Sequence, residues 1–159
     1  MKIKIVCVGK LKEKYLKDAI DEYTKRLSRF CTVHITELSD EKIPDNPSLS
    51  EEEKVLELEG EKILKNISPS DYVFSLCVEG KALTSEEFAQ KLSDIALSGK
   101  STVCFVIGGS LGLSKGVKAR SDFRLSFSKM TFPHQLMRVF LTEQIYRAFK
   151  INANEKYHK

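Results

Sequence analysis

The sequence predicts an α/β protein with a mainly parallel sheet flanked by helices. Segments rich in Ile and Val alternate along the chain with segments whose apolar residues recur every three or four positions, as in strands followed by amphipathic helices. Two apolar segments, Asp71–Val78 and Thr102–Ile107, are almost continuous runs, which is typical of strands buried on both faces of a parallel sheet. Alternating strands and helices favour parallel pairing.

The N-terminal third predicts two strand–helix pairs. Lys2–Val8 is an Ile- and Val-rich strand, and the apolar stripe of Leu11–Phe30 indicates a helix. Cys31–Leu38 alternates and predicts a second strand, whereas the two prolines of Ser39–Leu49 indicate a loop. Ser50 precedes three glutamates, so we expect a capping box there and a helix that reaches about residue 66.

The middle of the chain adds the two buried strands and shorter elements. Thr84 and Glu87 form a second capping box, which opens a helix to about Leu97. A helical turn is expected at Lys115–Arg120, followed by a strand near Phe123–Phe127.

Pro133 suits the first turn of a long C-terminal helix that reaches about Lys150. Its apolar residues lie on more than one face, so we expect one face to pack on the sheet and another on a second subunit. A charge at Met137, Leu141 or Ile145 should then disrupt a homodimer.

Composition narrows the functional classes. The net charge is +4, and residues 110–159 carry 10 basic and 3 acidic side chains. A partner rich in phosphate would explain this block, and so would a solvated surface. The apolar start is too short for a signal peptide and no stretch could cross a membrane, so we expect a cytoplasmic protein.

The cysteines do not have the spacing of a metal site. Each lies in or beside an apolar run, so we interpret them as small buried residues in a reducing compartment, with metal ligation or nucleophilic catalysis as the lesser alternatives. They are Cys7, Cys31, Cys77 and Cys104.

Three loops follow predicted strands, at the edge where parallel sheets bind ligands. They are Glu79–Leu83, Gly108–Leu113 and Ser128–Pro133. The glycine-rich loop is neither a GxGxxG motif nor a P-loop, which disfavours a classical dinucleotide or nucleoside triphosphate site. It is either another kind of ligand site or a tight turn. Phe127–His134 offers hydroxyls, backbone amides and aromatic side chains that suit an adenine ring, or it is a well-packed loop.

These segments together carry a family resemblance. GGSLGLS at 108–114, SFSKMTFPHQLMR at 126–138 and the terminal YHK resemble the ribosomal RNA large subunit methyltransferase H family of the SPOUT superfamily. The resemblance covers the full chain, so residues 1–159 are interpreted as one methyltransferase domain without a separate RNA-binding domain.

The resemblance implies a fold and an activity. The fold has a C-terminal trefoil knot, and the protein is a homodimer. The cofactor is S-adenosyl-L-methionine, and the reaction methylates N3 of a pseudouridine in 23S rRNA on the assembled ribosome, with no metal and no membrane. The implied cofactor contacts are Leu76, Gly108, Phe127, Ser128, Lys129, Met130, Thr131 and Phe132.

The chemistry suggests catalytic roles. The target imide nitrogen must lose a proton, and histidine is the usual base near neutral pH. His158 and His134 are the candidates. Tyr157 could stack on a base, and Arg138 could hold a phosphate or a developing oxyanion. By itself Tyr157–Lys159 would be interpreted as a frayed end, and Glu143 with Arg147 as a structural ion pair.

Two other functions are compatible with the pattern. One is a dehydrogenase or another enzyme with a nucleotide cofactor, which the missing GxGxxG and P-loop motifs disfavour. The other is a non-catalytic RNA-binding protein that uses the basic C-terminal block, although the chain has no RRM, KH or zinc signature.

Overall fold

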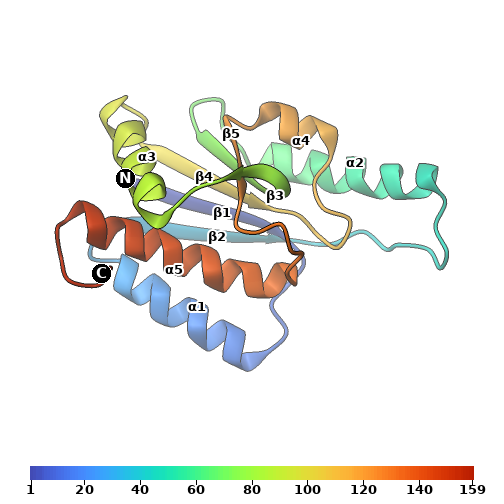
Figure 1. Ribbon diagram of the computed structural model, residues 1–159. Coiled ribbons are helices and arrows are strands. Elements are labelled where there is room, and N and C mark those ends of the chain that lie inside the picture. Colours follow the sequence, from blue (N-terminus) through green and yellow to red (C-terminus); the bar gives the residue numbers. More distant parts are fainter.

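A computed structural model describes residues 1–159 and contains one five-stranded sheet, in which all strands are parallel and the order is β2-β1-β4-β3-β5. The strands are β1 (Lys2–Val8), β2 (Thr32–Leu38), β3 (Tyr72–Ala82), β4 (Thr102–Ile107) and β5 (Phe123–Ser126). The helices are α1 (Lys14–Leu27), α2 (Leu49–Lys65), α3 (Ser85–Leu97), α4 (Lys115–Arg120) and α5 (His134–Asn152). The predicted α/β class is confirmed (Figure 1).

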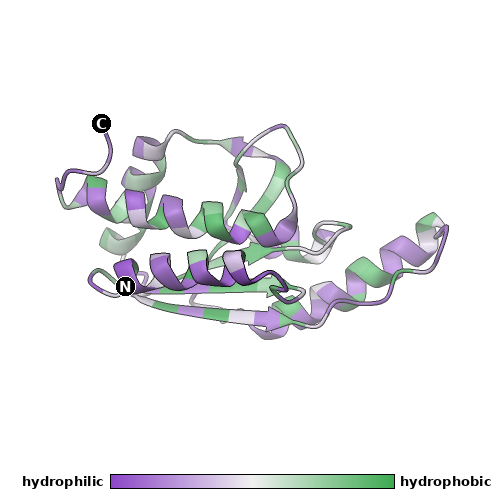
Figure 2. Ribbon diagram, turned by 90° about the horizontal axis from the view of Figure 1, so that it is seen from below, coloured by the Kyte–Doolittle hydropathy of each residue, from purple (hydrophilic) through white to green (hydrophobic).

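Helices cover both faces of the sheet because successive strand side chains point in opposite directions. In β1, Ile3 and Ile5 join the larger core cluster, which contains side chains from α1, α3 and α5. Val6 and Val8 join the smaller cluster, which contains side chains from α2 and α4. Figure 1 shows α1 and α5 side by side, and both views show α2 extending beyond the sheet (Figure 2). None of the helices is both long and apolar enough to span a membrane.

Two predicted helix starts differ from the structure. α1 begins at Lys14 rather than Leu11, because the Leu11 amide donates to a carboxylate oxygen of Glu37 (2.7 Å) and so ties this segment to β2. α2 begins at Leu49, where Ser48 and Glu51 form the capping box instead of Ser50. Both serines precede a glutamate by three residues, and the earlier cap lengthens the helix by two residues.

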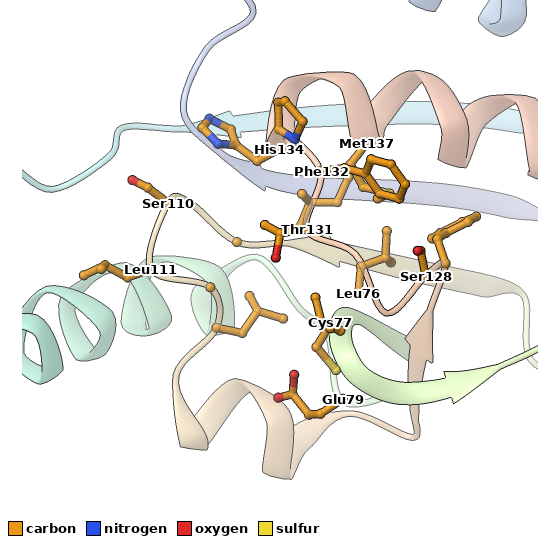
Figure 3. A pocket seen from close by; sticks show the side chains of 18 of the residues that line it. Leu76, Cys77, Glu79, Ser110, Leu111, Ser128, Thr131, Phe132, His134 and Met137 are labelled. Atoms are coloured by element: carbon orange, nitrogen blue, oxygen red, sulfur yellow. The ribbon is translucent and has the colours of Figure 1, made fainter.

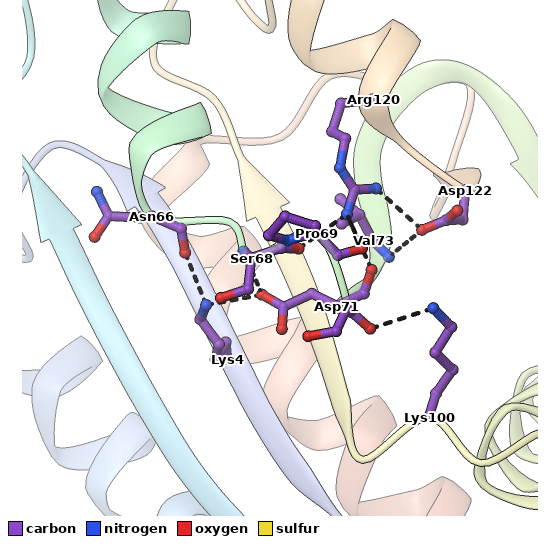
Figure 4. Close-up of polar contacts among 10 residues, drawn as sticks. Lys4, Asn66, Ser68, Pro69, Asp71, Val73, Lys100, Arg120 and Asp122 are labelled. Carbon is purple, nitrogen blue, oxygen red and sulfur yellow. Dashed lines mark hydrogen bonds and ion pairs between the residues drawn. The ribbon is translucent and has the colours of Figure 1, made fainter.

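A polar network closes the amino end of β3 (Figure 4). The Lys4 ammonium donates to Asp71 (2.8 Å) and the Arg120 guanidinium donates to the Asp71 carbonyl (3.1 Å). Asp122 accepts a hydrogen bond from the Val73 amide (2.8 Å). These contacts join the α2–β3 and α4–β5 connections, so this end of the sheet is occupied by structural hydrogen bonds.

The carboxyl end of the sheet is crossed by the chain itself. β5 is an edge strand beside β3, whereas the start of α5 contacts the end of β1 and β2 through Arg138. Residues 127–133 therefore pass across the carboxyl ends of β3 and β4. This crossing places the predicted ligand-binding segments next to one another.

Candidate active site

A cavity of about 590 Å³ lies at the carboxyl ends of β3, β4 and β5 (Figure 3). Its walls come from residues 76–79 within β3, the last residue of β4 with the glycine-rich turn that follows, one residue each of α4 and β5, and the crossing segment with the start of α5. The lining residues include Leu76, Gly108, Phe127, Ser128, Met130, Thr131 and Phe132. The structure thus brings together seven of the eight predicted cofactor contacts, and Lys129, which is exposed, is absent from the cavity wall.

The glycine-rich segment forms a tight turn on one side of the cavity. The Gly112 amide donates to the Gly109 carbonyl (3.0 Å), and Gly112 has φ +87°, which an L side chain would strain. A Cβ at Gly108 would lie 2.3 Å from the Gly112 carbonyl oxygen. A β-branched residue at Gly108 would therefore disturb the turn itself, and such a variant cannot separate cofactor binding from local folding.

The crossing segment is held by its own hydrogen bonds. The Ser126 hydroxyl donates to the Ser128 carbonyl (2.9 Å), and the Ser128 hydroxyl accepts from the Met130 amide (3.0 Å). Phe132 packs on Phe140 of α5 with ring centroids 5.6 Å apart. The loop therefore presents a fixed apolar and hydroxyl-bearing wall to the cavity.

His134 lines the cavity at the first position of α5. Burial lowers the pKa of its imidazole, and the nearby Arg138 charge lowers it further. The ring is therefore neutral at pH 7, and burial is the main cause. A neutral imidazole at this place can accept a proton.

Arg138 lies inside the protein, with 1% of its surface exposed. Its guanidinium donates to Glu37 (2.6 Å) and to the Gly9 carbonyl (2.7 Å). Burial alone would raise the pKa of Glu37, but hydrogen bonds from the Leu11 amide and from Arg138 lower it overall. Arg138 thus fastens α5 to β1 and β2 beside the cavity, and in this arrangement it does not face solvent where a phosphate could bind.

The tail packs against α5 and the start of α3, away from the cavity. The Tyr157 hydroxyl donates to Glu143 (3.0 Å), and the His158 ring lies between Arg147 (3.3 Å) and Glu86 (2.8 Å). The predicted Glu143–Arg147 ion pair is present (2.6 Å). Glu143 is nine residues beyond His134, or about 14 Å along the helix. Within one chain, His158 in the tail therefore lies far from His134 at the cavity.

Burial was predicted for all four cysteines, and three of them are buried. Burial raises the pKa of Cys7 and Cys31 to about 11 and that of Cys104 to about 12, so these thiols stay protonated. Cys77 is half-buried and lines the cavity, and burial raises its pKa as well. None of them has the lowered pKa of a reactive thiolate.

Sequence reasoning missed some residues of the cavity wall. Glu79–Leu83 was predicted to be a loop facing a ligand, which is wrong as to structure because β3 continues to Ala82, and neither Glu79 nor Cys77 was singled out as a site residue. Lys118 projects from α4 and Met137 from α5. Nothing in their local pattern distinguishes them, because their place in the wall depends on how distant segments pack.

The cavity suits a nucleoside-based cofactor in size and chemistry. Ligand pockets commonly have volumes of about 300–1,000 Å³, with apolar walls and a few polar groups. The wall here combines apolar side chains with the hydroxyls of Ser110, Ser128 and Thr131. The residues present therefore fit the cofactor that the resemblance implies.

Comparison with known proteins gives a consistent result. The family model described as "Predicted SPOUT methyltransferase" matches residues 1–158. The chain is 61% identical over 159 residues to the "Ribosomal RNA large subunit methyltransferase H" of Clostridium novyi (strain NT), with the full length of both covered. The proteins of that name from Clostridioides difficile (strain 630) and Clostridium botulinum (strain Okra / Type B1) are each 58% identical over the full lengths.

Proposed function

The chain belongs to the SPOUT methyltransferase family, and from this membership we propose that it methylates N3 of a pseudouridine in 23S rRNA, with S-adenosylmethionine as the methyl donor. The family implies a trefoil knot in the C-terminal part of the fold. The observation that carries the proposal is the cavity, whose wall contains seven of the eight residues implied as cofactor contacts. Full-length similarity to proteins named as ribosomal RNA methyltransferases supports the substrate.

S-adenosylmethionine, when bound, supplies a methyl group on a positively charged sulfur. The residues of the chain have to orient the reacting partners and exclude water, since in-line displacement depends mainly on placement. Leu76, Phe127 and Phe132 offer apolar surface for the adenine, and the turn at Gly108–Gly112 allows close approach to the backbone. Arg138 acts in this account as a positioning residue that holds α5 at the cavity.

The proton of the target imide needs an acceptor. We place this role on His158, which Tyr157 accompanies as a stacking ring. In one chain these residues lie far along α5 from the cavity, so the proposal requires the tail of a second copy to complete the site. His134, neutral and on the cavity wall, is the alternative base.

A tail that completes the site of a second copy requires a homodimer, which we place at α5. The charges at Met137, Leu141 or Ile145 that the sequence suggested do not test this interface. Leu141 and Ile145 are fully buried in the chain's own core, and Met137 lines the cavity. Charges there would damage the fold or the cavity and would not act on the dimer alone, as the sequence had led us to expect. Phe140 is 39% exposed, belongs to no core cluster and touches the cavity wall only through the Phe132 ring, so it is the better probe.

We expect Phe140→Glu to convert the dimer to a folded monomer, because a charge buried in an apolar interface is strongly unfavourable. Sedimentation velocity measures the mass and circular dichroism the fold. Leu97→Glu is the matched control, since Leu97 is 83% exposed at the end of α3. A Phe140→Glu variant that remains a dimer would place the interface elsewhere.

The identity of the bound cofactor distinguishes a methyltransferase from a dehydrogenase. In calorimetric titrations we expect the purified protein to bind S-adenosylmethionine and not NAD, because the glycine-rich turn is not a dinucleotide motif. Binding of NAD without S-adenosylmethionine would favour a dehydrogenase. The proposal also places the protein in the cytoplasm with ribosomes, where the basic residues of 110–159 would meet RNA phosphates.

A further inference from the structure

β3 contains an irregularity that shapes one wall of the cavity. Leu76 and Lys81 both pair with Leu125 of β5, so residues 77–80 bulge out of the ladder between them. Bulges of this kind redirect side chains near functional sites. Cys77, Val78 and Glu79, all in the bulge, line the cavity.

Gly80 holds the bulge directly against β5. A Cβ at this position would lie 2.8 Å from the Arg124 carbonyl carbon and oxygen. Only glycine permits this approach of the two backbones without displacement. The position of Glu79 is therefore set by the backbone.

Glu79 meets Lys118 at the cavity wall. The Lys118 ammonium, from α4, donates a hydrogen bond to the Glu79 carboxylate, and this bond lowers the pKa of Glu79. Lys118 is 27% exposed and Glu79 54% exposed. Figure 3 shows Glu79 on the opposite side of the cavity from Ser110 and His134, with Leu76 and Thr131 between them.

These two side chains are the permanent charges of the cavity wall. The other lining residues are apolar, carry hydroxyl groups, or, like His134 and Cys77, are neutral at pH 7. A ligand with both an ammonium and a carboxylate finds opposite charges for both at this one place. The pair can exchange its internal contact for two contacts with such a ligand, so no charge is left without a partner.

We propose that Glu79 and Lys118 bind the amino-acid end of the cofactor, with the Glu79 carboxylate on its ammonium and the Lys118 ammonium on its carboxylate. This assignment rests on the proposed function. It orients the cofactor with its nucleoside toward the apolar middle of the cavity and the glycine-rich turn.

Two ligands isolate the amino-acid end. S-adenosylhomocysteine carries it, 5′-methylthioadenosine lacks it, and both have a neutral sulfur. We expect the wild-type protein to bind S-adenosylhomocysteine about a hundredfold more tightly in calorimetric titrations, since charge-assisted hydrogen bonds are the strong ones. Glu79→Gln and Lys118→Met should each weaken that binding about tenfold and leave 5′-methylthioadenosine unaffected. The double variant should bind the two ligands equally.

Lys81→Met is the matched control, because Lys81 is an exposed cation at the end of the bulge and outside the cavity wall. It should bind both ligands as the wild type does. A double variant that keeps the wild-type preference would mean that Glu79–Lys118 is only a surface ion pair. An equal loss of affinity for both ligands would mean that Glu79 and Lys118 maintain the shape of the cavity and do not bind the amino-acid end. Wild-type protein that binds neither ligand would overturn the cofactor itself, and this assignment with it.

Discussion

Deletion of Tyr157–Lys159 should reduce methyl transfer to ribosomes by roughly a hundredfold or more, the loss typical of a missing general base. Binding of S-adenosylmethionine should stay nearly unchanged, because the tail lies away from the cavity of its own chain. The fold should also persist, since the tail belongs to neither core cluster. Labelled methyl transfer, calorimetry and circular dichroism measure the three quantities.

His158→Ala separates the proton acceptor from the rest of the tail. It should show part of the loss in methyl transfer while the fold and cofactor binding stay unchanged. Lys156→Ala is the control, because Lys156 is an exposed residue of the same tail. Full activity after the deletion would exclude the tail, and His134 would become the better candidate base.

Thr131→Trp should abolish measurable cofactor binding. Thr131 lines the cavity from a loop outside any helix or strand, so the added indole would occupy the space of the ligand without disturbing an element. We expect the Kd for S-adenosylmethionine to rise at least about a hundredfold, or roughly 2.8 kcal/mol. The melting temperature should change little.

Lys129→Trp provides the matched control on the same loop. Lys129 is exposed and does not line the cavity, so this variant should bind the cofactor as the wild type does. If Thr131→Trp binds with wild-type affinity, the cofactor site is elsewhere. Equal loss in both variants would instead show that the loop tolerates no large side chain.

Much of the fold follows from local pattern. β1 and β4 have the predicted bounds because their buried apolar runs end at clear turn residues, and α4, capped by Ser114, also has the predicted bounds. The capping box at Thr84 and Glu87 is also present. Elements whose ends are decided by tertiary contacts differ from their predicted bounds. β3, for example, continues to Ala82 beyond its apolar run, because pairing with β5 resumes after the bulge.

Some residues of the candidate site could be predicted from the sequence and others could not. Gly108 and the crossing segment could be found because the resemblance marks them and because they follow predicted strands. Glu79 and Lys118 could not, since a bulge and a short helix bring together residues 39 positions apart. Arg138 follows His134 by four residues in α5, yet its burial depends on Glu37, which lies 101 positions away and carries no local indication of the contact.

Methyl transfer to ribosomes tests the central claim most directly. Purified protein would be incubated with labelled S-adenosylmethionine and ribosomes that lack the modification, and the RNA would be digested and analysed by mass spectrometry. We expect label in large-subunit RNA, on N3 of a pseudouridine. The absence of any methyl group on the RNA, with a folded protein that binds the cofactor, would contradict it.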